Sequence, residues 1–225
     1  MPVAEVETVL NEVINCVQEI DRECATVLND VEHGLINVES EFQERALVET
    51  GKFLTGEPLI AWLTWKKLRE RGWRAEWEVR YPRSNRKKCD IVVGLDPKEQ
   101  LWLELKLASK AWFNCEGGPA YNDSLFRSYL RGTHRSHSFR QDFEKLTDNP
   151  EYWSAEDYRS VCLIGFDSVA RPMDAEVTEM VREVQQAGSL WRLVSEGHWH
   201  DRRCSDFRIS AWCWLLEGQI EAANC

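Results

Sequence analysis

The chain has 225 residues, of which 43% are hydrophobic and 29% charged, a composition typical of a globular protein with a sizeable core. No run approaches the roughly 20 apolar residues that a membrane helix needs, and the acidic start lacks the pattern of a signal peptide. We therefore expect a cytoplasmic protein without a membrane partner, in which the eight cysteines, none in a CxxC pair, form no disulfide framework.

The formal net charge of −10 is unevenly distributed along the chain. Residues 1–57 carry 13 acidic and 3 basic side chains, whereas residues 66–145 carry 18 basic and 11 acidic ones. Because the local field decides what a surface attracts, the middle of the chain can face a phosphate backbone although the whole chain is acidic.

The first predicted element is an acidic amphipathic helix within residues 1–35, set apart from a domain of residues 36–225. Apolar side chains recur at alternating spacings of three and four over residues 3–31, which is the stripe of a heptad repeat. The stripe suits a helix docked on the body of the same chain, and it equally suits a helix pair in a homodimer through residues 3–31. Both interpretations remain open at this point.

The following segments alternate between helical and strand periodicity. Helices are predicted over residues 38–53, from a start at Thr55-Gly56-Glu57-Pro58 to a stop at Arg71-Gly72, over 138–147 and over 174–187. Strands are predicted over residues 74–81, 89–94, 101–107, 160–166 and 207–216, and residues 109–137 form a long loop in which 124–131 could make a short helix. This order predicts an α/β fold with a central mixed sheet of about five strands, flanked by helices on both faces in an α-β-β-β-α-β core.

Two neighbouring strands carry the residues that point to chemistry. In the strand of residues 101–107, the leucines share one face, while Trp102, Glu104 and Lys106 share the other. Asp90 lies in the preceding strand, and the short turn between the two predicts antiparallel neighbours, which can place Asp90 beside Glu104. Burying such charges is costly unless they are paired or bound to a metal.

A pair of carboxylates at this place can hold a divalent cation. Asp90 and Glu104 supply the hard oxygen ligands that Mg²⁺ or Mn²⁺ prefers, and the cation would polarise a phosphoryl oxygen and lower the pKa of a bound water. Lys106 could orient that water, accept its proton or stabilise charge in the transition state. The alternative is a structural ion pair of Glu104 with Lys106, with Asp90 as an acid at a strand edge.

Asp90, followed by Glu104-Leu105-Lys106 as an E-x-K element within helix–strand–strand–strand–helix–strand order, resembles the PD-(D/E)XK nuclease superfamily. The resemblance covers about residues 57–167 and implies a restriction-endonuclease-like fold. It implies that Asp90, Glu104 and the main-chain carbonyl of Leu105 hold the metal, and that Lys106 acts on the attacking water.

The same resemblance implies a further acid from the helix before the first strand. Glu57 is our first choice for this catalytic residue and Glu49 the second. The chain departs from the superfamily pattern at Cys89, where a proline commonly precedes the aspartate.

Basic segments flank the predicted site on both sides in the sequence. Clusters of lysine and arginine displace counterions from phosphates and bind nucleic acid with little sequence preference. The predicted nucleic-acid-binding residues are Arg83, Arg86, Lys87, Lys88, Arg127, Arg131, Arg135 and Arg140. Together these features predict a Mg²⁺- or Mn²⁺-dependent endo- or exonuclease acting on phosphodiester bonds, in DNA ahead of RNA. The alternative is a catalytically inactive relative of the same fold that binds nucleic acid or protein.

Overall fold

The computed structural model has a six-stranded mixed sheet with the strand order β1-β2-β3-β6-β8-β7. Its strands are β1 (Arg74–Arg80), β2 (Lys88–Gly94), β3 (Gln100–Ser109), β6 (Asp157–Ser168), β7 (Trp191–His200) and β8 (Phe207–Leu216). A separate two-stranded sheet is formed by β4 (Ala111–Phe113) and β5 (Pro119–Tyr121). The structure describes residues 3–23, 41–52, 54, 56–82, 84, 87–96, 98–113, 119–121, 123, 126–127, 130, 138–147, 153–186, 188, 190–200 and 205–217.

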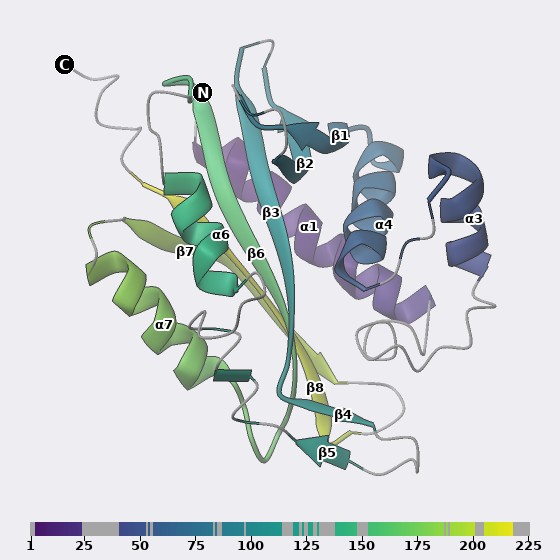
Figure 1. The fold of residues 1–225 in the computed structure, drawn as a ribbon, viewed down its shortest axis with the longest axis vertical. Coiled ribbons are helices and arrows are strands. Elements are labelled where there is room, and N and C mark those ends of the chain that lie inside the picture. The colour runs from purple at the N-terminus through teal and green to yellow at the C-terminus, as the bar shows by residue number, and fades with distance from the viewer. Residues whose placement is uncertain are drawn as a thin grey trace.

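Helices cover both faces of the main sheet, as Figure 1 shows. The helices are α1 (Val3–Glu23), α3 (Glu41–Thr50), α4 (Glu57–Glu70), α6 (Phe139–Thr147) and α7 (Asp174–Gln186). α1 and α4 pack on one face, with α3 beside α4, and α6 and α7 pack on the other (Figure 1). The predicted α/β architecture is thus confirmed, with six strands in the main sheet where about five were expected.

The alternation of β3 separates the two faces of the sheet. β3 pairs antiparallel with β2 and parallel with β6. Its odd-numbered leucines join the core beneath α1 and α4, whereas Trp102 joins the core beneath α6 and α7. Because side chains alternate along a strand, Glu104 and Lys106 lie on the same side as Trp102, facing α6.

Within the main sheet, the strand that the sequence patterns did not predict is β7; outside it, β4 and β5 lie in residues 109–137, where a long loop was predicted. β7 forms an edge of the sheet, pairs only with β8 and has an irregular register between Leu193 and Ser195. Only Trp191 and Ser195 are buried along its ten residues, so its apolar alternation is too weak to register as a strand. The Ser195 hydroxyl donates to the side-chain oxygen of Asn11 at 2.6 Å, so α1 helps to hold this strand in place.

The heptad stripe of α1 is buried within the same chain. Val6, Leu10, Val13 and Val17 are fully buried and Ile20 is 1% exposed, all in one core cluster with the sheet. Of the two interpretations, the docked helix therefore describes residues 3–23, and the predicted homodimer through this stripe has no support, because the stripe is already covered. The remainder of the stripe and the predicted boundary at residue 35 lie outside the described residues. Among the helices that the structure describes, none has both the length and the apolar character to cross a bilayer.

Candidate functional site

The predicted site lies where β2 separates from β3. The register between the two strands ends at Ile91 and Leu103, so the main-chain groups of β3 beyond this point need other partners. Asp90 supplies one, because its Oδ2 accepts a hydrogen bond from the N–H of Leu105 at 2.8 Å. The thiol of Cys89, at the position where the superfamily commonly has proline, is buried and donates to the carbonyl of Leu103 at 3.2 Å. Side chains of β2 thus replace part of the missing ladder.

Glu57 reaches the same edge of β3 from the start of α4. Gly56 has a φ of 60°, a left-handed conformation that favours glycine, and Pro58 fits the first turn of the helix that follows. The Oε2 of Glu57 accepts from the N–H of Leu107 at 3.2 Å, and its Oε1 accepts from the Nζ of Lys106 at 2.9 Å. The start of α4 is therefore fixed to β3 by a carboxylate that also holds the predicted catalytic lysine.

Two further charged residues enter from α6. Phe139, Phe143 and Leu146 anchor this helix in the core, and the anchoring directs Asp142 and Lys145 toward β3. The Nζ of Lys145 lies 2.5 Å from Oε1 of Glu104, and Oδ2 of Asp142 lies 3.5 Å from the Nζ of Lys106.

Sequence reasoning missed both residues of α6, although a signal for one of them was present. Asp142 follows Phe139 by three residues and precedes Leu146 by four, which puts an acid on the apolar face of the helix. An acid at such a position is buried on folding and needs a partner. Lys145 carries no comparable signal, because a lysine near the end of a helix is ordinary.

The structure thus brings together six charged residues, which we call the acid–lysine cluster. Its members are Glu57, Asp90, Glu104, Asp142, Lys106 and Lys145. Fully ionised, these residues carry four negative and two positive charges in a largely buried place, and the imbalance is costly in a medium of low polarisability. Protons or a cation can remove it.

The pKa values of two acids in the acid–lysine cluster report this imbalance. Burial raises the pKa of Asp90 to about 7, and the carboxylate of Glu57 adds to the effect while the N–H of Leu105 opposes it. Burial also raises the pKa of Glu104, against the lowering effect of Lys145. Both acids therefore hold protons at pH values at which exposed carboxyl groups are ionised.

Unlike these acids, Lys106 is held in its charged form. Burial by itself would lower its pKa, but the carboxylates of Glu57 and Asp142 outweigh burial and raise the pKa above the ordinary value. The side chain is 9% exposed, so these neighbours keep a charged ammonium fixed inside the protein. Such a group can donate hydrogen bonds and stabilise negative charge, whereas it is a poor proton acceptor.

The residue types at this place, carboxylates and a main-chain carbonyl, are ligands of the kind that Mg²⁺ or Mn²⁺ prefers. Asp90 and Glu104 offer carboxylate oxygens, and the carbonyl of Leu105 lies on the same edge of β3 as its N–H, which faces Asp90. A divalent cation would also reduce the excess of negative charge in the fully ionised acid–lysine cluster. Across the described part of the chain, no group of three or more His, Cys, Asp or Glu side chains could hold a metal ion; the predicted ligands are two carboxylates and one carbonyl.

Of the two acids considered for the preceding helical region, only Glu57 contacts a member of the predicted site. Glu49 is in α3 and accepts from the Nζ of Lys66 at 2.6 Å, with 41% of its side chain exposed. It therefore belongs to the surface of α3 and α4.

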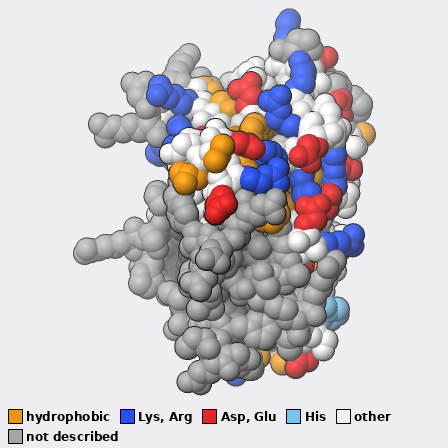
Figure 2. All heavy atoms as spheres, turned by 90° about the vertical axis from the view of Figure 1, so that its right-hand side faces the viewer, with side chains coloured by type: hydrophobic (Ala, Val, Ile, Leu, Met, Phe, Trp, Pro, Cys, Tyr) orange, Lys and Arg blue, Asp and Glu red, His pale blue; other side chains and the backbone are white. Residues whose placement is uncertain are grey.

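The predicted nucleic-acid-binding residues are only partly described. Arg83, Arg86, Arg131 and Arg135 lie outside the described residues. Lys87, Lys88 and Arg127 are exposed, and Arg140 is 36% exposed. Lys88 is paired with Glu78 at 2.6 Å and Arg140 with Glu144 at 2.9 Å. Basic and acidic side chains also lie side by side on the face that carries α3 and α4, as Figure 2 shows.

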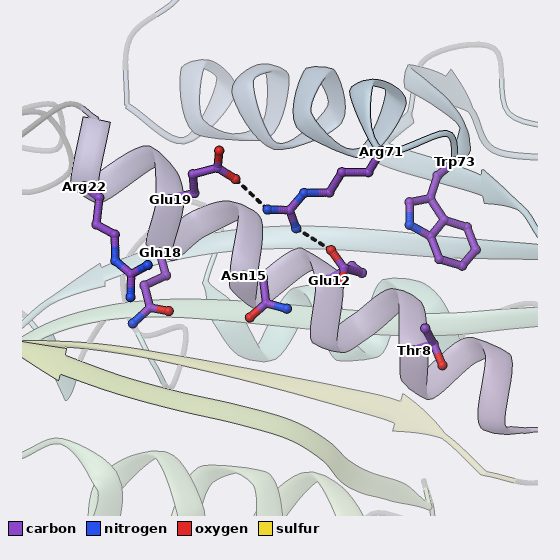
Figure 3. Close-up of a pocket in the computed structure, with 8 residues that line it drawn as sticks. All are labelled: Thr8, Glu12, Asn15, Gln18, Glu19, Arg22, Arg71 and Trp73. Atoms are coloured by element: carbon purple, nitrogen blue, oxygen red, sulfur yellow. Dashed lines mark hydrogen bonds and ion pairs between the residues drawn. The ribbon is translucent and has the colours of Figure 1, made fainter.

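A hollow of about 620 Å³ lies between α1 and the end of α4, away from the acid–lysine cluster. Figure 3 shows the guanidinium of Arg71 pointing into it between Glu12 and Glu19, and Arg71 donates to both carboxylates. The charge of Arg71 is thus already neutralised by Glu12 and Glu19. Because these three side chains are occupied with one another, they offer no carboxylate pair to a metal ion and no guanidinium to a phosphate. The acid–lysine cluster is the stronger candidate for chemistry.

The chain matches none of the known protein-family models, curated proteins or solved structures with which it was compared. Its function is therefore interpreted from its own residues. The decisive geometry is the convergence of side chains from β2, β3, α4 and α6 at the open edge of β3.

Proposed function

We propose that the chain is a nuclease that depends on Mg²⁺ or Mn²⁺ and hydrolyses phosphodiester bonds, in DNA in the first instance. The observation that carries the proposal is that Asp90 of β2, which is partly buried, lies against the edge of β3 that bears the buried side chains of Glu104 and Lys106. Two carboxylates beside a fixed ammonium are the parts that metal-assisted hydrolysis of a phosphodiester needs. The resemblance of these residues to the PD-(D/E)XK pattern supports the same reaction.

In this proposal each residue has a separate part. Asp90, Glu104 and the Leu105 carbonyl would hold a divalent cation, which would supply polarisation of a phosphoryl oxygen and a lower pKa for a bound water. Lys106 orients the water and stabilises charge, because its two carboxylate neighbours keep it protonated. Glu57 acts as a positioning residue, since it holds the ammonium of Lys106 at 2.9 Å.

The substrate class is proposed from charge. Residues 66–145, which include most of the acid–lysine cluster, carry 18 basic and 11 acidic side chains. Exposed basic side chains such as Lys87 and Arg127 can contact a phosphate backbone in a way that weakens with salt. Loss of binding between low and physiological salt is the signature expected of such contacts.

A second candidate is a relative of the same fold without catalysis, which binds nucleic acid or protein. The observation in its favour is that Glu57 and Glu104 are each paired with a lysine, Lys106 and Lys145 respectively. Such pairs could make the acid–lysine cluster a purely structural feature of the core.

The test is cleavage of plasmid, linear and single-stranded DNA, and of RNA, by protein freed of metal and then given Mg²⁺ or Mn²⁺. We expect cleavage only with metal, and a loss of about 10²-fold or more in Glu104→Gln and Lys106→Met. Asp96→Asn, which changes an exposed acid in the turn between β2 and β3, is the matched control and should cleave normally. Cleavage at the wild-type rate by a folded Glu104→Gln protein would refute the proposal. Binding of Mn²⁺ without any cleavage would favour the second candidate.

A further inference from the structure

The ammonium of Lys145 lies beside a carboxylate, a main-chain carbonyl and an aromatic ring, all of which can interact with a cation. Its Nζ lies 2.5 Å from Oε1 of Glu104 and 3.5 Å from the main-chain carbonyl of Lys88, and it stands 5.0 Å from the ring centre of Tyr81. Glu104 is almost fully buried, with 5% of its side chain exposed, whereas Lys145 keeps 23% exposed. A buried carboxylate is thus neutralised by an ammonium that enters from the surface.

Other acids of the acid–lysine cluster also affect the pKa of Lys145. Burial acts to lower its pKa, but Glu104, Asp142 and Asp90 together raise the pKa above the ordinary value. The positive charge of Lys145 is therefore stabilised by both acids that we assign to the metal. No other lysine described by the structure has an ion pair with Glu104.

A divalent ion on Glu104 would compete with the ammonium of Lys145 for the same carboxylate. Held 2.5 Å from Oε1 of Glu104, the ammonium would also repel the divalent ion in a site shielded from water. The backbone of α6 is held by Phe139, Phe143 and Leu146, so the side chain of Lys145 is the part that can move. Its four-carbon stem and partial exposure allow the ammonium to turn toward solvent.

We propose that Lys145 is the built-in counter-ion of the metal centre: its ammonium neutralises Glu104 in the metal-free protein and leaves Glu104 when a divalent cation binds. This inference rests on the proposed function, because it needs the metal site formed by Asp90 and Glu104. It makes loading of the metal a competition between the cation and a side chain of the protein itself. It also means that metal binding releases a positive charge at the rim of the site, where a phosphate of the substrate would arrive.

The first experiment measures Mn²⁺ binding by titration calorimetry on the full chain, with Mn²⁺ alone as the probe. Lys145→Met should bind Mn²⁺ at least tenfold more tightly than the wild type, with Lys145→Gln as a second variant in case the first does not fold. Lys110→Met is the matched control, because Lys110 is also a buried lysine in an ion pair, at 2.6 Å from Glu176, and it should leave the affinity unchanged.

Lys106→Met separates displacement from a general effect of charge. It removes the same charge from the acid–lysine cluster without vacating Glu104, so its gain in affinity should be clearly smaller than that of Lys145→Met. An equal gain, or no gain in either Lys145 variant, overturns the inference. If neither the wild type nor any variant binds Mn²⁺, the proposed function fails as well; if the wild type binds and the Lys145 variants bind no more tightly, only the inference fails.

The second experiment follows the side chain itself. Lysines of the wild-type protein are acetylated with acetic anhydride in the presence and absence of Mn²⁺, and the extent of labelling at each lysine is measured by mass spectrometry. Labelling of Lys145 should rise several-fold with Mn²⁺, while labelling of Lys110 stays constant. A Lys145 that reacts equally in both states overturns the inference, because the ammonium would then have kept its place beside Glu104.

Discussion

Replacing Asp90 with asparagine should change how the stability of the metal-free protein depends on pH. Asparagine keeps the size of the side chain and an oxygen that can accept from the N–H of Leu105, the contact that Asp90 makes at 2.8 Å. It removes the ionisable group. The variant therefore isolates the cost of a charge at this position from the loss of the hydrogen bond.

The expected size follows from the pKa of Asp90, which burial and the carboxylate of Glu57 raise from 3.8 to about 7. Since the folded protein keeps a proton that the unfolded chain has lost between these two values, stability falls as the pH rises through this window and levels off above it. From pH 5 up to the folded pKa of about 7, stability falls by about 1.4 kcal/mol for each pH unit. The fall between pH 5 and pH 8 is therefore about 3 kcal/mol. This is an upper limit, because neighbouring acids adjust when the charge is removed.

The assay is urea unfolding in EDTA at pH 5 and pH 8, followed by tryptophan fluorescence. The difference in unfolding free energy between Asp90→Asn and the wild type should shift in favour of the variant by up to about 3 kcal/mol from pH 5 to pH 8. Asp96→Asn, at an exposed acid on the following turn, should show no such shift. A difference that stays the same at both pH values would refute the reasoning, because Asp90 would then ionise like an exposed carboxyl group.

Three further comparisons test the fold outside the acid–lysine cluster by the same unfolding measurement. Leu10→Ala in the buried stripe of α1 should lower the free energy of unfolding by about 2–5 kcal/mol. Asn15→Ala on the exposed side of the same helix should change it by no more than about 0.5 kcal/mol. Equal effects would contradict docking of the stripe. Glu78 has a φ of 51°, so Glu78→Gly should be about 1 kcal/mol more stable than Glu78→Ala, and the reverse order would show that the backbone is not strained there. Asp167 is fully buried and accepts from Arg208 at 2.9 and 2.6 Å, so Asp167→Ala should cost about 3–5 kcal/mol. A loss below about 1 kcal/mol would mean that Asp174, which Arg208 also contacts, is enough to neutralise the guanidinium.

The local pattern of the sequence is sufficient for the architecture and for the placing of Asp90, Glu104 and Lys106 on two neighbouring strands. Strict alternation over residues 101–107 places Glu104 and Lys106 on one face of a strand, and this needs no knowledge of the rest of the fold. The short turn before that strand makes the strand of Asp90 its antiparallel neighbour. Helical and strand periods along the chain were likewise enough to predict a sheet covered on both faces by helices.

Only the tertiary structure decided which elements meet at the site. Periodicity describes one element at a time, so it could not place Lys145 of α6 on Glu104, choose between Glu57 and Glu49, or show that the stripe of α1 is covered by its own chain. It also missed β7, whose two buried side chains, Trp191 and Ser195, contact Phe143 of α6 and Asn11 of α1 respectively. These outcomes depend on contacts between residues far apart in the sequence, and the open edge of β3 that gathers the charges exists only because β2 turns away from it.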